Sequence, residues 1–321
     1  MVKAYCGYIK NEDLLKKSAS GGAATALSLS VLQQGGVVYG VAYASDFKSV
    51  KYIRVDNFDL VKEIQGSKYL KASVAKIFGS VEKDLKNETK VLFIGLPCDV
   101  AALKRNLESR QIDSSNLITI DLICHGPTFA RVADIYLSRL EKKFKSSIKH
   151  ISVRYKKPNW VPPYLFVSFE NGKRYCKEFY KTDYGIAFST MQLDGCYHCK
   201  FKGDNHVSDI TIGDYWGIDE TDVGYNELGT SILFVHNEKG ENFIFSLHNF
   251  SLFDADLKKA LQGNPMYSIA KEKNQQSQIF KKNFEKKGLS YAVSKELGFF
   301  RNIIRKLPSP IVTVLKKIKN W

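Results

Sequence analysis

The chain has 321 residues, enough for one large or two ordinary domains. No apolar run reaches membrane-span length and Met1–Tyr5 does not begin a secretory signal, so we expect a cytoplasmic protein whose six cysteines serve metal or redox chemistry instead of disulfides. The net charge of +15 is concentrated in residues 271–321, which hold 13 Lys and Arg against three Glu. The body is only mildly basic, which argues against nucleic-acid binding.

The N-terminal segments predict a strand over 4–9 and a helix over 23–32, joined by Ser-Ala-Ser-Gly-Gly at 18–22. A helix start with free N–H groups and little side-chain bulk can hold a phosphate. A capped helix packed tightly on a sheet explains the same residues equally well. Cys6 has no cysteine nearby in the sequence, and we expect it to be a small buried residue.

A strand over 37–43 and its hairpin partner over 51–55 come next, followed by Gly-Ser-Lys-Tyr at 66–69 and a helix over 73–85. The Ser and Lys of this loop could contact a phosphate or the edge of a flavin. On the sequence alone, an exposed loop with a solvated Lys is the simpler interpretation.

Two cysteine turns follow two apolar strands. The strand over 91–96 leads to Cys98 and a helix over 99–107, and the strand over 117–122 leads to Cys124 and a helix over 129–144. This repetition is typical of βαβ units. If the strands are parallel neighbours, both cysteines lie at the carboxyl edge of one sheet, where α/β proteins place ligands. The helix dipole would favour a thiolate at Cys98, just ahead of its helix.

From residue 150 the pattern becomes antiparallel, with strands over 151–155, 164–169 and 174–180 and a hairpin turn at Asn171-Gly172. We expect Cys176 to be structural. A helix over 183–191 would deliver Cys196 and Cys199, whose C-x-x-C spacing suits a shared metal centre. A strand over 208–217 ends in a Gly-Asp-Tyr-Trp-Gly turn, which suits a flat ligand or simply a tight, aromatic-packed turn.

The predicted fold class is α/β, with a mixed sheet core built from βαβ units, an antiparallel strand region and a helical, basic C-terminal tail. We place one domain at 1–250, with halves of about 1–145 and 146–250, and an extension at 251–321. Apolar and cationic residues alternate at helical spacing over 298–307 and 311–321. This pattern fits contact with an anionic membrane face or a partner, and a helix packed on the body is the simpler alternative.

The three cysteine segments are expected to converge on one four-thiolate site. A structural zinc usually takes two closely spaced pairs, and only one pair is close here. A catalytic dithiol at Cys196 and Cys199 leaves the other two thiols unexplained. An iron–sulfur cluster accepts thiolates from scattered segments. Spacing alone favours the cluster only slightly.

Six motifs, which follow one another within residues 4–240, together resemble the beta subunit family of the coenzyme F(420) (deazaflavin) hydrogenases and dehydrogenases. They are the segments 18–22, 66–69, 95–103, 124–126, 196–199 and 208–217. The resemblance implies an FAD- and iron–sulfur-dependent oxidoreductase that couples one-electron transfer through a 4Fe-4S cluster to hydride chemistry at FAD. The cluster ligands it implies are Cys98, Cys124, Cys196 and Cys199. The flavin contacts it implies are Ser20, Gly21, Gly22, Ser67, Lys68 and Tyr69. We add Asp214 as a cofactor contact because it lies in the Gly-Asp-Tyr-Trp-Gly turn, which suits a flat ligand. His125, beside a cluster ligand, could donate a proton near the flavin, although a structural hydrogen bond is its simpler role.

Many relatives carry an N-terminal ferredoxin-like segment, and this chain begins directly with the flavin region. The resemblance therefore implies electrons from a separate donor, such as a ferredoxin or a reduced nicotinamide or deazaflavin. Family members linked to surface-polysaccharide genes suggest a small-molecule or sugar substrate, with the tail at the inner face of the cell membrane. The competing hypothesis is a non-catalytic electron-transfer or structural-metal subunit.

Overall fold

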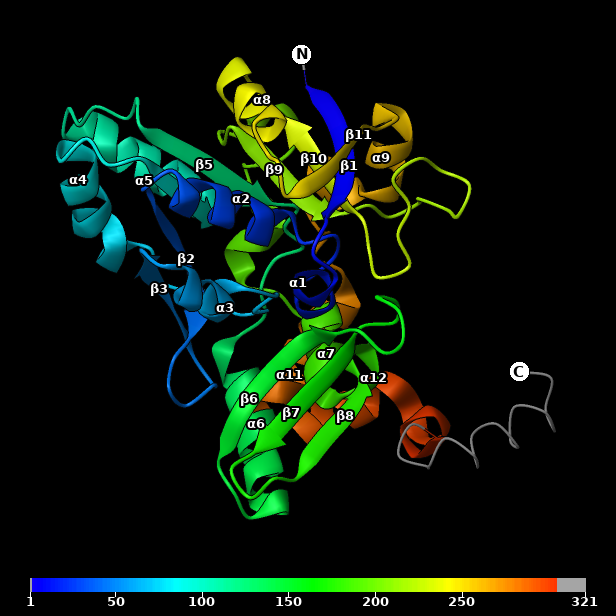
Figure 1. The fold of residues 1–321 in the computed structure, drawn as a ribbon. Coiled ribbons are helices and arrows are strands. Elements are labelled where there is room, and N and C mark those ends of the chain that lie inside the picture. Colours follow the sequence, from blue (N-terminus) through cyan, green and yellow to red (C-terminus); the bar gives the residue numbers. More distant parts are fainter. Residues whose placement is uncertain (1, 305–321) are drawn as a thin grey trace.

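The computed structural model describes residues 2–304, with side chains through residue 298. It contains an eight-stranded mixed sheet in the order β11-β1-β10-β9-β5-β4-β2-β3 and a three-stranded antiparallel sheet in the order β6-β7-β8 (Figure 1). The strands are β1 (Lys3–Ile9), β2 (Val37–Tyr43), β3 (Val50–Val55), β4 (Val91–Gly95), β5 (Leu117–Leu122), β6 (Ile148–Tyr155), β7 (Tyr164–Phe169), β8 (Arg174–Glu178), β9 (Ile210–Asp214), β10 (Ser231–Val235) and β11 (Phe250–Asp254). The predicted α/β class, with a mixed sheet and a separate antiparallel region, is confirmed.

Four neighbouring strands of the large sheet, β2, β4, β5 and β9, run parallel. Gly95 at the end of β4 lies opposite Asp121 near the end of β5, and Leu122 of β5 lies opposite Ile212 of β9. The carboxyl ends of these strands therefore meet at one edge of the sheet, as predicted for the two cysteine-bearing strands.

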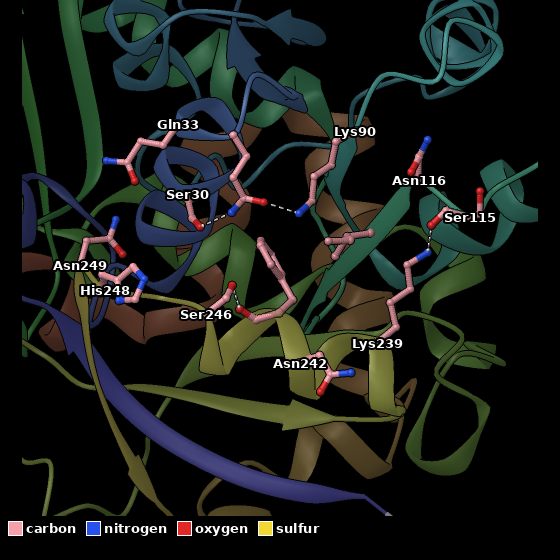
Figure 2. Close-up of a pocket in the computed structure, with 13 residues that line it drawn as sticks. Ser30, Gln33, Lys90, Ser115, Asn116, Lys239, Asn242, Ser246, His248 and Asn249 are labelled. Carbon is pink, nitrogen blue, oxygen red and sulfur yellow. Dashed lines mark hydrogen bonds between the residues drawn. The ribbon is translucent and has the colours of Figure 1, made fainter.

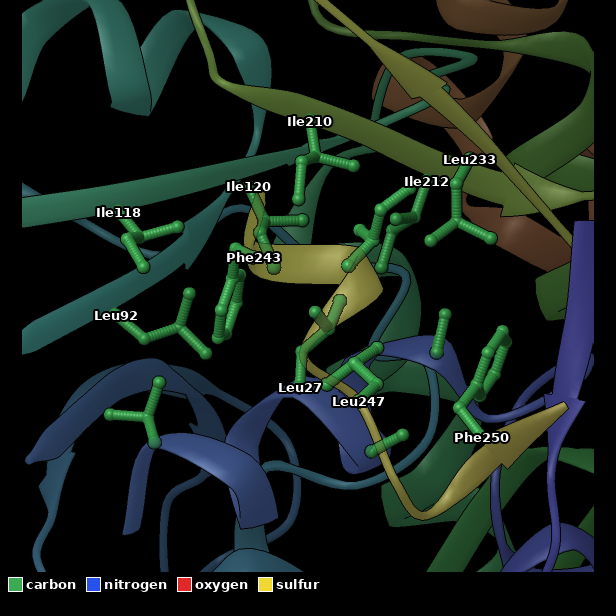
Figure 3. Packing of buried hydrophobic residues seen from close by; sticks show 14 of the residues in the cluster. Leu27, Leu92, Ile118, Ile120, Ile210, Ile212, Leu233, Phe243, Leu247 and Phe250 are labelled. Carbon is green, nitrogen blue, oxygen red and sulfur yellow. The ribbon is translucent and has the colours of Figure 1, made fainter. Parts of the chain in front are cut away.

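Helices cover both faces of the large sheet. On one face α2, α3 and α8 bury an apolar core that includes Leu27 and Phe243 against the sheet side chains Ile120, Ile212 and Leu233 (Figure 3). On the other face α4 and α5 pack over β2, β4 and β5, while α9 and α10 pack over β1 and β10. The bounds of these helices are α2 (Ala23–Gln33), α3 (Val61–Ile64), α4 (Phe78–Lys86), α5 (Pro97–Ser109), α8 (Glu238–Phe245), α9 (Leu257–Gly263) and α10 (Pro265–Ser268).

The small sheet has its own hydrophobic core. Alternating side chains of β7, Leu165, Val167 and Phe169, are buried beneath helices, as the period of a half-buried strand requires. The helices around this core are α6 (Ala130–Phe144), α7 (Asp183–Thr190), α11 (Gln275–Lys287) and α12 (Leu289–Ile304), whereas α1 (Glu12–Lys17) follows β1. The predicted hairpin turn joins β7 to β8, and Gly172 there has a φ of +80°.

Some predicted boundaries differ from the structure. Helix α5 begins at Pro97, because the fixed φ of proline suits a first helical turn, so Cys98 lies inside that turn and not ahead of it. The helix expected over 73–85 begins as a 3-10 turn at Ala75 and becomes α-helical at Phe78. The strand expected over 174–180 ends at Glu178, where a 3-10 turn buries Phe179.

The C-terminal region is shared between the two cores. β11 joins the large sheet beside β1, and α11 and α12 pack in the core of the small sheet. The proposed division after residue 250 therefore falls within β11. Most of the basic tail, residues 305–321, on which membrane contact was predicted, lies outside the described residues. Within the described part, no helix is both long and apolar enough to span a membrane.

Candidate functional site

The structure brings the cysteine segments together at the carboxyl edge of the large sheet. Cys124 follows β5, and the backbone N–H of Gly126 donates to its sulfur at 3.3 Å. A Cβ placed on Gly126 would lie 2.9 Å from the Cβ of Cys196, so these two segments touch. Gly126 also has a φ of +88°, where L side chains are strained. Glycine is thus required at the point where the Cys124 turn meets the Cys196 turn.

The four predicted ligand thiols lie within electrostatic reach of one another. Burial, followed by the neighbouring sulfurs of Cys98 and Cys196, raises the pKa of Cys124 to about 12. Burial also raises the pKa of Cys196, and charge at Cys98 and Cys199 adds to that effect. Packing thiols this closely disfavours their ionisation unless a cation lies among them.

The donor set differs from a ready-made single-ion site. Among the described side chains, no three from His, Cys, Asp and Glu lie close enough to hold one metal ion. A tetrahedral zinc needs four donors, with sulfur at about 2.3 Å from a single point. An iron–sulfur cluster binds each thiolate at its own iron, so it accepts thiols that are near one another but more widely spaced.

Two lysine side chains form contacts with the residues that carry or flank the thiols. Lys71 pairs with the buried carboxylate of Asp99 and also contacts Cys98, where its charge opposes the rise of the thiol pKa that burial causes. Lys202 donates to the carbonyls of Cys124, at 2.6 Å, and of Met266. Positive charges at these positions favour thiolates. Neither lysine was singled out from the sequence, although Lys202 follows the C-x-x-C pair by three residues.

A second group lies where the two sheets meet. Arg154 of β6 donates two hydrogen bonds, of 2.7 and 2.8 Å, to the carboxylate of Asp214 at the end of β9. The same guanidinium contacts the hydroxyl of Tyr69 at 3.4 Å, and the Tyr69 ring stacks on Phe188. Two residues expected to touch a flavin, Tyr69 and Asp214, are thus joined by an arginine that the sequence analysis did not identify.

His125 is exposed beside this group. Although the residue is exposed, the protein atoms around it desolvate its ring, and this effect and then the charge of Lys202 lower its pKa, whereas Asp214 acts in the opposite direction. His125, next to Cys124 in the sequence, is therefore close enough to Lys202, Arg154 and Asp214 for their charges to act on it. Its predicted roles, as a proton donor near the flavin and as a structural hydrogen-bonding residue, both stay predictions.

The Ser20, Gly21 and Gly22 segment is buried against the protein itself. Ser20 Oγ donates to the carbonyl of Thr230 at 2.7 Å, and a Cβ on Gly21 would lie 2.2 Å from the carbonyl oxygen of Gly7. The close approach of strands is sufficient reason for these glycines, as the tight-packing alternative supposed. Phosphate binding at the start of α2 stays a prediction.

Lys68 and Ser67 lie on the half-buried loop after α3. Lys68 Nζ donates to the carbonyl of Gln65 at 2.8 Å, and burial lowers the Lys68 pKa to about 7. The ammonium is thus held by the protein and is not a freely solvated loop cation. Binding of a flavin by Ser67 and Lys68 stays a prediction.

Lys156, another lysine missed by sequence reasoning, ties the small sheet to the N-terminal segment. Its Nζ donates to the carbonyls of Leu15 at 2.6 Å and Ser20 at 2.7 Å, and burial lowers its pKa to about 7. Beside it lies a cavity of about 750 Å³ between α1 and the loop 220–228, with Leu15 in its wall. Nearby, Trp216 of the predicted Gly-Asp-Tyr-Trp-Gly turn stacks on Trp160 at 4.9 Å, so this turn is aromatic-packed.

The two remaining cysteines lie apart from the thiol group. Cys6 is buried in β1 and its thiol approaches the carbonyl of Val223, as expected for a small buried residue. Cys176 lies mid-strand in β8 but is exposed, so it is not part of a core, and its structural role is not supported.

Comparison with known proteins agrees with the motif order. A family model described as the N-terminal part of the coenzyme F420 hydrogenase/dehydrogenase beta subunit matches residues 4–78, and the model of its C terminus matches residues 88–253. One chain of the xenon-derivatised F420-reducing [NiFe] hydrogenase complex from Methanosarcina barkeri has a similar fold, with a TM-score of 0.55 and 17% identity over 83% of this chain and 89% of that chain. No match was found among the curated proteins. The two family matches span most of the large sheet and both cysteine regions, and the chain belongs to the coenzyme F420 hydrogenase/dehydrogenase beta subunit family.

Proposed function

We propose that this protein is an iron–sulfur flavoprotein oxidoreductase. In this proposal Cys98, Cys124, Cys196 and Cys199 hold one 4Fe-4S cluster, and FAD binds alongside. The observation that carries the proposal is the mutual approach of these four thiols at the carboxyl edge of parallel strands, with Lys71 and Lys202 around them. Family membership and the hydrogenase fold support a redox role for a site with this donor set.

The chemistry of the donor set fits a cluster. Thiols whose pKa is raised by burial and by one another become stable thiolates only when iron or another cation balances their charge. Four-iron clusters exchange one electron at a time and a flavin exchanges a hydride or two electrons, so the two together couple one-electron donors to two-electron substrate chemistry.

The chain's own residues would position these groups. Lys202 holds the loop after Cys199 on the Cys124 turn, and Lys71 holds the first turn of α5 through Asp99. Arg154 fixes Asp214 and the Tyr69 hydroxyl at the junction of the two sheets. His125, which is exposed and follows Cys124, would hold or release a proton next to a bound substrate.

The remaining assignments are carried by the family resemblance. They are a separate electron donor and an acceptor from surface-polysaccharide synthesis. Because the fold matches a chain in a multi-subunit hydrogenase complex, protein partners are also expected. A non-catalytic subunit is the alternative, and its electron-transfer form needs no flavin of its own.

Flavin content separates enzyme from scaffold. The full chain, purified without oxygen, would be denatured and the released flavin identified by chromatography. Stoichiometric FAD, bleached by dithionite and re-oxidised by an electron acceptor, is the expected result. Protein that never carries flavin, even after incubation with excess FAD, would contradict the enzymatic proposal. Arg154→Met should lower FAD retention, whereas the exposed-site control Lys16→Met should not.

A further inference from the structure

A second cavity, of about 730 Å³, lies at the opposite edge of the large sheet from the cysteines. Its walls come from the end of α2, from α8, and from residues that precede β4 and β5 (Figure 2). These residues lie at the amino ends of the strands, whereas Cys98 and Cys124 follow the carboxyl ends. This amino-edge cavity is therefore separate from the proposed redox site.

The lining of the amino-edge cavity is cationic and rich in hydrogen-bonding groups. It contains two lysines, Lys90 and Lys239, together with amides and hydroxyls, and no carboxylate among the described residues lines it. Neither lysine forms a salt bridge among the side chains that the structure describes. Asp113 and Asp209 influence Lys239 only at longer range. Negative charge is thus missing where two ammonium groups face one cavity.

Both ammonium groups are held by neutral oxygens of the protein. Lys90 Nζ donates to Oε1 of Gln34 at 2.5 Å and lies 5.6 Å from the centre of the Phe243 ring. Lys239 Nζ donates to the carbonyl of Ser115 at 2.7 Å, and burial lowers its pKa. An anion would add the attraction between opposite charges to each ammonium, which these neutral oxygens do not supply.

The lining also limits the kind of ligand. A nucleotide site usually offers an aromatic face to the base, but among the described residues of this wall Phe243 is only 5% exposed and His248 is the one exposed ring. The cavity volume lies in the range of small-molecule sites. An anion with several hydroxyls, and without an aromatic base, therefore fits best.

We propose that the amino-edge cavity binds an anionic, polyhydroxylated small molecule, such as a hexose phosphate or a uronic acid, with its negative charge between Lys90 and Lys239. The hydroxyls then reach exposed amides and hydroxyls of the wall, such as Asn242 and Ser246. This site does not depend on the cofactors proposed at the cysteine edge.

Binding can be measured directly. We would titrate the full chain, purified without oxygen, with glucose 6-phosphate, glucuronate, inorganic phosphate and glucose by calorimetry at constant ionic strength. At least one of the two sugar anions should bind, and glucose should bind at least about tenfold more weakly, since it lacks the charge. Inorganic phosphate should also bind more weakly than glucose 6-phosphate, since it lacks the hydroxyls.

Matched variants locate the site. Lys90→Gln with Lys239→Gln should weaken binding about tenfold or more. The charge-matched control, Lys51→Gln with Lys62→Gln on exposed positions elsewhere, should leave binding unchanged. Asn242→Asp, on the exposed surface of α8 in the cavity wall, should also weaken binding without disturbing the fold. The proposal is overturned if neither sugar anion binds, if both binding-site variants bind as the wild type does, or if phosphate binds as tightly as glucose 6-phosphate.

Discussion

Arg154 and Asp214 form a bidentate ion pair that joins the small sheet to the large one. Its two N–O distances are 2.7 and 2.8 Å, and the side chains are only 8% and 14% exposed. A guanidinium and a carboxylate in this parallel geometry form one of the stronger polar contacts in proteins. Arg154 also contacts the hydroxyl of Tyr69, which is one of the residues predicted to contact a flavin.

We expect Arg154→Met to lower the free energy of unfolding by about 3–5 kcal/mol, because it leaves the Asp214 carboxylate buried without its partner. Denaturant titration measures this loss. The control is Lys16→Met, which removes an exposed pair with Glu12 and should change the unfolding free energy far less. Equal losses in the two variants would mean that the buried pair does not hold the sheets together.

Substitution of Gly126 tests the contact between the Cys124 turn and the Cys196 turn. Gly126 and Gly172 have similar φ values, +88° and +80°, but a Cβ on Gly172 would meet no atom within 4 Å, whereas one on Gly126 would collide with Cys196 and Gln192. Gly172→Ala should therefore cost only the backbone strain, about 1–2 kcal/mol. Gly126→Ala should cost more and should also lower the iron content of the purified protein. Similar unfolding energies and iron contents for both variants would contradict the contact.

Lys156 predicts a pH dependence of stability. Burial, and next the charge of Arg154, lower its pKa to about 7 in the folded chain, from the ordinary 10.5. Between these values the unfolded state binds the extra proton, so stability should rise with pH above about 7 and be flat, for this group, below it. Unfolded thiols also titrate near pH 8.5, but they do so in every variant, so the difference between the slopes over pH 7–8.5 isolates the lysine.

Lys156→Met should therefore flatten the rise of the unfolding free energy over pH 7–8.5, by at most about 1.4 kcal/mol per pH unit. Lys17→Met, on an exposed position, should keep the wild-type slope. Urea titrations at several pH values give the slopes directly. A Lys156→Met slope that equals the wild-type slope would show that this lysine stays protonated throughout.

The parallel pairing of the two cysteine-bearing strands could be expected because short apolar runs followed by cysteine turns and helices are typical of βαβ units. That pattern placed Cys98 and Cys124 at one edge, and the register of β4 with β5 confirms it. The approach of Cys196 to Gly126 was expected only because the C-x-x-C spacing of Cys196 and Cys199 indicated a metal centre. About seventy residues of antiparallel sheet and helix separate the two positions in the sequence. Periodicity carries no information about such a long-range contact.

Residues that act through charge were the hardest to predict. Arg154 occupies an ordinary position in an alternating strand, and only the packing of β6 beside the end of β9 gives it Asp214 as a partner. The function of Gly21 and Gly22 could not be decided from the sequence, because phosphate binding and close packing against a strand both require a residue without a side chain. The structure shows the packing, with Gly21 against the Gly7 carbonyl.

The central claim is tested most directly by iron and acid-labile sulfide analysis of the chain purified without oxygen. We expect about four iron and four sulfide per chain. Single Ser substitutions of Cys98, Cys124, Cys196 and Cys199 should each remove most of this iron, whereas Cys6→Ser and Cys176→Ser should retain it. Wild-type protein without iron after anaerobic reconstitution, or equal iron in all six variants, would contradict the four-thiolate cluster.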